Sequence, residues 1–67
     1  MPRAYNTTTK LGKKMVEQNW PAGEFAAMTG INPRTLTEYL SGRSRPSTQH
    51  LWAMADVLGV DAEEIDE

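Results

Sequence analysis

The sequence predicts an all-α fold, a compact domain of five short helices, and three observations support this. The chain has 67 residues, enough for one small domain. Apolar residues recur at the i, i+3, i+4 spacing of a helix in several segments, and no segment alternates as a strand does. Prolines and glycines fall between these segments, where helices begin and end.

The first helix follows a short arm. Residues 1–7 show no apolar periodicity and are predicted to be flexible, whereas residues 8–67 form the domain. Thr8 or Thr9 caps a first helix that runs to about Asn19. Its inward side chains are predicted to be Leu11, Met15 and Val16, and its outward ones Lys10, Lys13, Lys14 and Glu17.

The second and third helices are separated by a glycine. Pro21 suits the first position of a short second helix, which Gly30 ends. Asn32 and Pro33 form a strong start for the third helix, and Gly42 closes it. The predicted core side chains of this region are Phe25, Ala26, Ile31, Leu36, Tyr39 and Leu40.

A basic connection leads to the fourth helix. Pro46 stops helix propagation, Ser47 caps the fourth helix and Gly59 ends it. Its inward side chains are predicted to be Leu51, Trp52, Ala55 and Leu58, with Met54 also more typical of a core than of an interface. Asp61 opens a last short helix, in which Glu64 completes a capping box and Ile65 reaches the core.

Composition excludes several classes of function. There is no cysteine and only one histidine, His50, so no disulfide, thiolate or His-based metal site is expected. No nucleophile–base pair, carboxylate pair or phosphate loop indicates an enzyme. No apolar run reaches the roughly 20 residues of a membrane span, and no signal peptide opens the chain. We therefore expect a soluble, cytoplasmic protein that uses no cofactor, membrane or small-molecule ligand.

The charges are divided along the chain. Residues 1–45 carry seven basic and three acidic side chains, a net charge of +4. Residues 46–67 carry six acidic side chains and no lysine or arginine, a net charge of −6. This division indicates one end that faces a polyanion and one that is repelled by it or faces a partner, although a mixed solvated surface with an acidic tail explains it equally well.

The span from Phe25 to Pro46 carries the functional signal. A short helix, a turn and a second helix with a polar outer side, followed by two arginines, form the arrangement that DNA recognition needs. Here the sequence resembles the Cro/repressor-type (XRE-type) helix-turn-helix family over about residues 9–65. The matching residues are Phe25, Ala26, Gly30, Ile31, Leu36, Tyr39, the run Ser41 to Ser47, Leu51, Ala55, Leu58, Gly59 and Val60.

The resemblance implies a lambda-repressor-like domain that binds an operator in double-stranded DNA, with the helix Asn32–Ser41 inserted into the major groove. Many members have a glutamine that contacts phosphate where this chain has Ala22 and Gly23, so backbone N–H groups at that helix start are the expected substitute. Leu40 also replaces a buried glutamate of many members, which exchanges a polar contact for packing.

Five residues are the candidate base contacts: Asn32, Arg34, Thr35, Thr37 and Glu38. Arg34 is the strongest, because a guanidinium binds guanine with two hydrogen bonds, although an ion pair with Glu38 is its alternative role. Asn32 is also explained by capping alone. The threonines suit a phosphate or a thymine methyl group, or plain exposure to solvent.

The candidate phosphate contacts are Ala22, Gly23, Ser41, Arg43, Ser44, Arg45, Lys10 and Lys14. Arg43 and Arg45 lead this group, because the resemblance places their loop along the DNA backbone. A lysine-rich helix surface such as that of Lys10 and Lys14 is more often only solvated. Arg3 in the arm suits a minor groove, but a disordered terminus explains it better.

The sequence thus predicts a sequence-specific transcriptional regulator of the small phage-type Cro or repressor class, acting as a weak homodimer that is reinforced on DNA. Val57 and the segment after Val60 are the expected dimer surface, and a strip of His50, Ala53, Met54 and Val57 is a second possibility. The alternative is a helical protein-interaction module, such as the antitoxin of a toxin–antitoxin pair, for which the acidic half argues.

Overall fold

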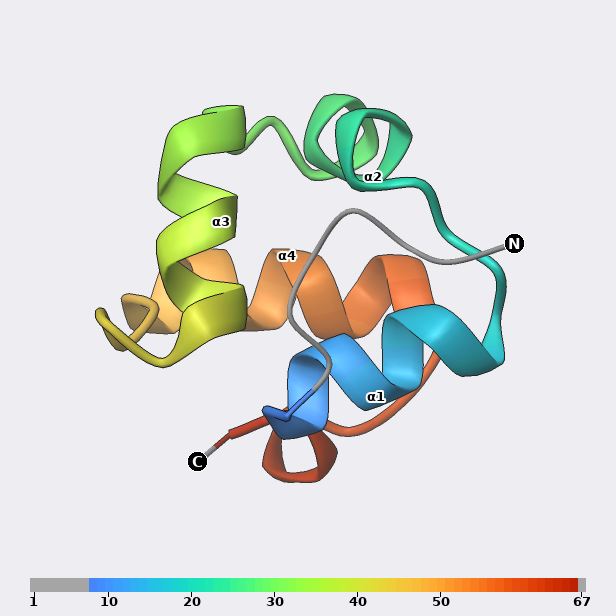
Figure 1. Ribbon diagram of the computed structural model, residues 1–67. Coiled ribbons are helices and arrows are strands. Elements are labelled where there is room, and N and C mark those ends of the chain that lie inside the picture. The colour runs from blue at the N-terminus through green and yellow to red at the C-terminus, as the bar shows by residue number, and fades with distance from the viewer. Residues whose placement is uncertain (1–7, 67) are drawn as a thin grey trace.

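The computed structural model describes residues 8–66, which form four α-helices followed by one short 3-10 helix (Figure 1). The elements are α1 (Lys10–Glu17), α2 (Ala22–Thr29), α3 (Pro33–Ser41), α4 (Thr48–Leu58) and the 3-10 helix η1 (Ala62–Glu64). The all-α class is confirmed, and residues 8–66 contain no strand. Five helices are not confirmed, because the last predicted helix is a single 3-10 turn of three residues. The predicted flexible arm, residues 1–7 with Arg3, lies outside the described residues.

Short-range hydrogen bonds set where the helices begin. The side chains of Thr9, Asn32 and Ser47 accept hydrogen bonds from backbone N–H groups in the first turns of α1, α3 and α4. These side chains satisfy donors that the helix itself leaves without a partner. All three caps agree with the sequence prediction, whereas α1 ends at Glu17, two residues before the expected end.

Glycines set where three of the helices end. Gly30 and Gly42 adopt the left-handed backbone conformation with φ of 72° and 80°, and Gly59 does the same after α4. A residue with a Cβ atom is strained there, so glycine lets the chain reverse direction directly after α2 and α3. The turn between α2 and α3 is consequently only Gly30 to Asn32.

One hydrophobic core joins all five elements. Its largest fully buried side chains are Phe25, Met15, Leu36, Leu40 and Met54. Ile31 and Ile65 are also buried, as the sequence predicts. The ring of Trp20 packs edge-on against that of Phe25, with centroids 5.6 Å apart.

Two predicted core residues are instead at the surface: Trp52 is 64% exposed and Val16 is 37% exposed. In α4 the buried positions are Met54, Ala55 and Leu58, with Leu51 half-buried beside them. These residues follow the i, i+3, i+4, i+7 spacing of one helix face. Trp52 directly follows Leu51 and therefore lies beside that face rather than on it. Because Met54 is fully buried, it is not part of a strip available to a second subunit.

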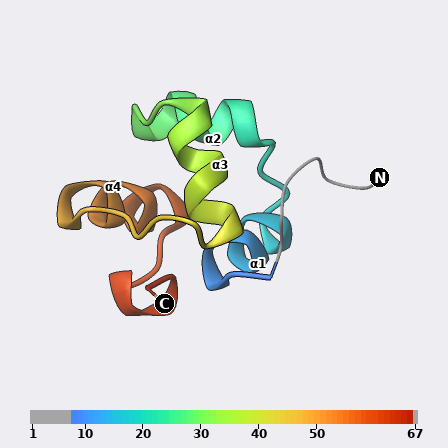
Figure 2. The ribbon, with the colours of Figure 1, turned by 60° about the vertical axis from the view of Figure 1, so that its left-hand side comes forward.

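The arrangement leaves one side of α3 at the surface. Figures 1 and 2 show that α2 and α3 cross at a wide angle. The helix α4 runs past the lower half of α3, and α1 lies next to α3. The C-terminal segment lies below α1 and α4, away from α2. None of the helices in residues 8–66 is both long and apolar enough to cross a lipid bilayer.

Candidate DNA-binding surface

The helix α3 has one buried and one polar side. Leu36, Tyr39 and Leu40 are buried, as predicted. The opposite side and the cap carry the predicted base contacts, of which Asn32, Arg34, Thr37 and Glu38 are exposed and Thr35 is half-buried. The structure therefore brings all five predicted base contacts together on one helix and its cap.

The start of α3 is fixed by its own side chains. The Oδ1 atom of Asn32 accepts a hydrogen bond from the backbone N–H of Arg34 at 2.9 Å. Pro33 occupies the first helical position, where the missing N–H group has no consequence. The capping role of Asn32 uses only the oxygen of its amide, so the NH₂ group remains as a donor for a ligand outside the protein.

The exposed side chains of α3 differ in which hydrogen-bonding groups they leave available for DNA. Arg34 and Glu38 are one turn apart, but no ion pair joins them in the described part of the chain. The hydroxyl of Thr37 donates to the carbonyl oxygen of Pro33 at 3.0 Å. Because a threonine hydroxyl has one proton, Thr37 presents an acceptor and a methyl group outward.

The loop that follows α3 is folded back onto the end of the helix. The carbonyl oxygen of Glu38 accepts hydrogen bonds from the backbone N–H groups of Arg43 at 3.0 Å and Ser44 at 3.4 Å. It also accepts one from the hydroxyl of Ser41 at 3.0 Å. The backbone of the first arginine of this loop is therefore fixed relative to α3, while the side chain of Arg43 is exposed.

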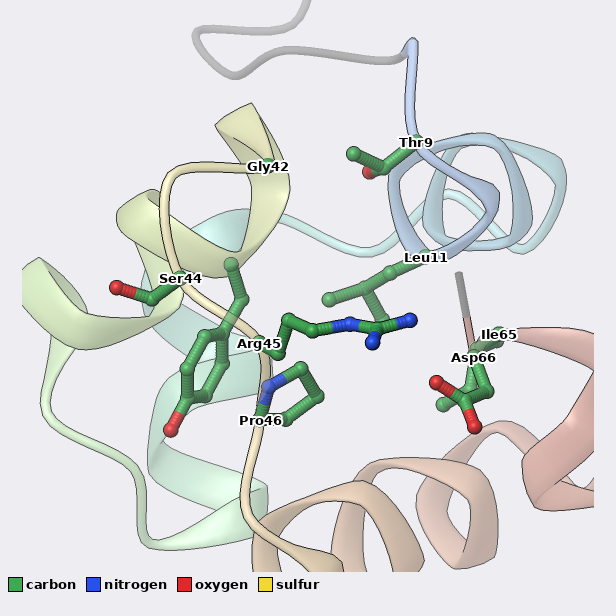
Figure 3. Close-up of a pocket in the computed structure, with 9 residues that line it drawn as sticks. Thr9, Leu11, Gly42, Ser44, Arg45, Pro46, Ile65 and Asp66 are labelled. Carbon is green, nitrogen blue, oxygen red and sulfur yellow. The ribbon is translucent and has the colours of Figure 1, made fainter.

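The second arginine of the loop lines a pocket of about 240 Å³ between α1, the end of α3 and the C-terminal segment. The lining residues are Thr9, Leu11, Tyr39, Gly42, Ser44, Arg45, Pro46, Ile65 and Asp66. Figure 3 shows the side chain of Arg45 extending across this pocket toward Ile65 and Asp66, whereas the hydroxyl of Ser44 points away from it. Arg45 thus lines the pocket and Arg43 does not, although nothing in the sequence distinguishes them.

The first turn of α2 presents backbone rather than side-chain groups. Pro21 precedes this helix and provides no side-chain cap. Ala22 is half-buried, and Gly23 is exposed with nothing within 4 Å of where a Cβ atom would lie. The N–H groups of a first helical turn have no partner within the helix, so this end of α2 can donate to an anion.

The two predicted lysine contacts face the C-terminal segment. The Nζ atom of Lys14 lies 3.8 Å from a carboxylate oxygen of Glu64 and 3.6 Å from one of Glu17. The Nζ atom of Lys10 donates to the backbone oxygen of Asp66 at 3.2 Å. Contact of either lysine with a phosphate would compete with these interactions.

The structure also contains a contact that the sequence analysis missed. The hydroxyl of Tyr39 and the Nδ1 atom of His50 are 2.7 Å apart, across the ends of α3 and α4. The sequence indicates His50 as an exposed helix residue, but it is half-buried. The only signal for this pair was that both residues lie within one turn of the loop between the two helices.

The pattern of the chain also matches a known family. A family model described as Helix-turn-helix matches residues 11–65, which is more than half of the chain. No curated protein and no solved structure gives a significant match. The matched family consists of DNA-binding regulators that are typically not enzymes. The chain therefore belongs to the XRE/Cro-type helix-turn-helix family and is a DNA-binding transcription regulator.

Proposed function

We propose that this protein is a sequence-specific regulator of the Cro or repressor type, which inserts the segment Asn32–Ser41 into the major groove of an operator. The observation that carries the proposal is the division of α3 into a buried side and a polar side, next to a loop of two arginines whose first half is hydrogen-bonded to the same helix. Such a helix reads base edges while the neighbouring cations neutralise phosphates.

The base contacts come from the exposed side of α3. Arg34 is in the first turn, has no ion pair with Glu38 and suits guanine through two hydrogen bonds. Asn32 contributes its amide NH₂ group, and Thr37 its methyl group or hydroxyl oxygen. Glu38 accepts from a cytosine amine or disfavours other bases, and Thr35 lies at the edge of the surface.

The phosphate contacts surround this helix. Ser41 is the last residue of this helix, and Arg43 and Ser44 follow it, whereas the N–H groups of Ala22 and Gly23 lie at the start of α2. Arg45 joins them when its side chain leaves the pocket near Asp66. Lys10 and Lys14 reach a phosphate only by leaving their partners in the C-terminal segment.

Selectivity requires two subunits. One recognition helix covers only about four base pairs, too few to select one site in a genome, whereas a two-fold dimer doubles the sequence that is read. We propose that the homodimer forms through Val57 and the segment after Val60. The acidic C-terminal half repels the DNA and is therefore the half left for the partner subunit.

Selection of bound sequences from a random pool of duplex DNA tests this function, with footprinting of the selected complex. We expect a pseudo-palindromic site whose half-site centres are about 34 Å apart. Enrichment of no sequence, with equal binding to all duplexes, would contradict the proposal.

The alternative is a protein-interaction module such as an antitoxin. The observation that favours it is the acidic C-terminal segment, which already engages Lys10 and Lys14. A mobility shift on nonspecific duplex DNA at low salt separates the two functions. A pure protein-interaction module gives no shift, whereas a DNA regulator does.

A further inference from the structure

A hydrogen bond between Tyr39 and His50 joins the two helix ends from which the loop between α3 and α4 extends. Tyr39 lies in the last turn of α3 and is 9% exposed, and His50 lies in the first turn of α4 and is half-buried. The hydroxyl of Tyr39 is 2.7 Å from Nδ1 of His50, and the two rings meet edge to face with centroids 5.8 Å apart. Either tautomer of the histidine forms this bond, because a tyrosine hydroxyl both donates and accepts.

The loop between these residues is anchored at both ends. At its start, the carbonyl oxygen of Glu38 accepts from the N–H groups of Arg43 and Ser44. At its end, the hydroxyl oxygen of Ser47 accepts from the backbone N–H of His50 at 3.3 Å. His50 therefore uses its backbone to start α4 and its side chain to hold that start against α3.

This placement affects how the surface meets DNA. Phosphate contacts set the position of a recognition helix along the duplex, and base contacts require that position to be accurate. A hydrogen bond tolerates only a few tenths of an ångström in length. If the loop shifted relative to α3, its arginines would still bind phosphates. The base-reading side chains of α3 would then no longer lie within hydrogen-bonding distance of the base edges.

We propose that His50 is a positioning residue for DNA recognition. Through Tyr39 it holds the loop that carries Arg43 and Arg45 at a fixed distance from the polar side of α3. This inference rests on the proposed function. According to this inference, the preference for one DNA sequence depends in part on Tyr39 and His50, which do not themselves contact the DNA.

The test compares specific with nonspecific affinity in the full chain. Fluorescence anisotropy gives the affinity of each variant for the selected site and for a shuffled duplex of equal length. Tyr39→Phe keeps the ring and removes the hydroxyl, and His50→Ala removes the imidazole. We expect each to lower the ratio of specific to nonspecific affinity by about three- to ten-fold, the factor that one hydrogen bond supplies.

Two further variants keep the result interpretable. His50→Asn places an amide oxygen near the position of Nδ1, and we expect it to restore most of the ratio. Gln49→Ala changes an exposed neighbour on α4 and should leave the ratio unchanged. Circular dichroism at the temperature of the binding assay checks that every variant is folded.

A purely structural role of the pair gives a different pattern. The melting temperatures of Tyr39→Phe and His50→Ala then fall while the ratio of affinities stays that of the wild type, and this result would overturn the inference. Equal binding of both duplexes by the wild-type protein would overturn the proposed function, and the inference with it. A wild type that prefers the selected site while both variants keep that preference overturns the inference alone.

Discussion

The hydroxyl of Thr9 donates a hydrogen bond to the carbonyl oxygen of Leu40 at 3.0 Å, across 31 positions of sequence. The Oγ1 atom of Thr9 also accepts a hydrogen bond from the backbone N–H of Gly12 at 3.1 Å, which caps α1. Thr9 is 8% exposed and is the only buried polar residue among the described residues. One side chain thus starts α1 and fixes the end of α3 against it, behind the proposed DNA-binding surface.

Removal of this hydroxyl should destabilise the fold. Thr9→Val keeps the shape of the side chain but leaves the N–H group of Gly12 and the carbonyl of Leu40 without this partner. We expect the free energy of unfolding to fall by about 1–3 kcal/mol, measured by urea denaturation. Thr9→Ser keeps the hydroxyl and serves as the control, with a smaller loss. Equal stability of Thr9→Val and the wild type would contradict this role.

Arg34 should determine preference at one base pair. Arg34→Ala is expected to weaken binding to the selected site by about 1–3 kcal/mol and to relax selection at a single position, measured by repeating the selection with the variant. Arg34→Lys keeps the charge but not the paired hydrogen bonds, so it should show the same relaxed position. An equal loss on every sequence would instead make Arg34 a phosphate contact.

Arg43 should act on all sequences alike. Its side chain is exposed next to α3, so Arg43→Ala should weaken the selected and the shuffled duplex by similar factors. For the wild-type dimer, about 4–10 phosphate contacts give a slope of log affinity against log salt of about −4 to −9. The variant should have a shallower slope. Affinity that does not change between low and physiological salt would contradict the phosphate contacts.

Local sequence patterns predicted the helices and their ends, because the physical causes are local. The caps Thr9, Asn32 and Ser47 act within three residues of themselves, and glycines such as Gly42 end a helix through their own backbone conformation. The same patterns failed for Trp52. Periodicity identifies a buried side, but a residue at its edge is buried only if a neighbouring helix covers it.

Local sequence patterns could not predict the contacts between distant segments. Tyr39 with His50 and Lys14 with Glu64 are pairs whose members lie on different elements. Their meeting depends on how the helices pack, and no local spacing encodes it. For the candidate site, the sequence therefore predicted which side of α3 is polar. It did not predict that Arg45 enters a pocket or that two lysines face the acidic segment.

Salt should act in opposite directions on the two associations of this protein. The proposed dimer surface, at Val57 and after Val60, lies within a segment of net charge −6, so the subunits repel one another at low salt. We expect a weak dimer in solution that strengthens as salt rises, whereas binding to DNA weakens. Sedimentation of the protein at low and high salt measures the strength of the dimer, and anisotropy measures the affinity for DNA.

Glu63 is exposed in this segment, and Glu63→Gln should strengthen the dimer at low salt while leaving the preferred DNA sequence unchanged. A single chain bound to an asymmetric site would contradict the dimer, and a tight dimer at low salt would show that the acidic side chains do not oppose it.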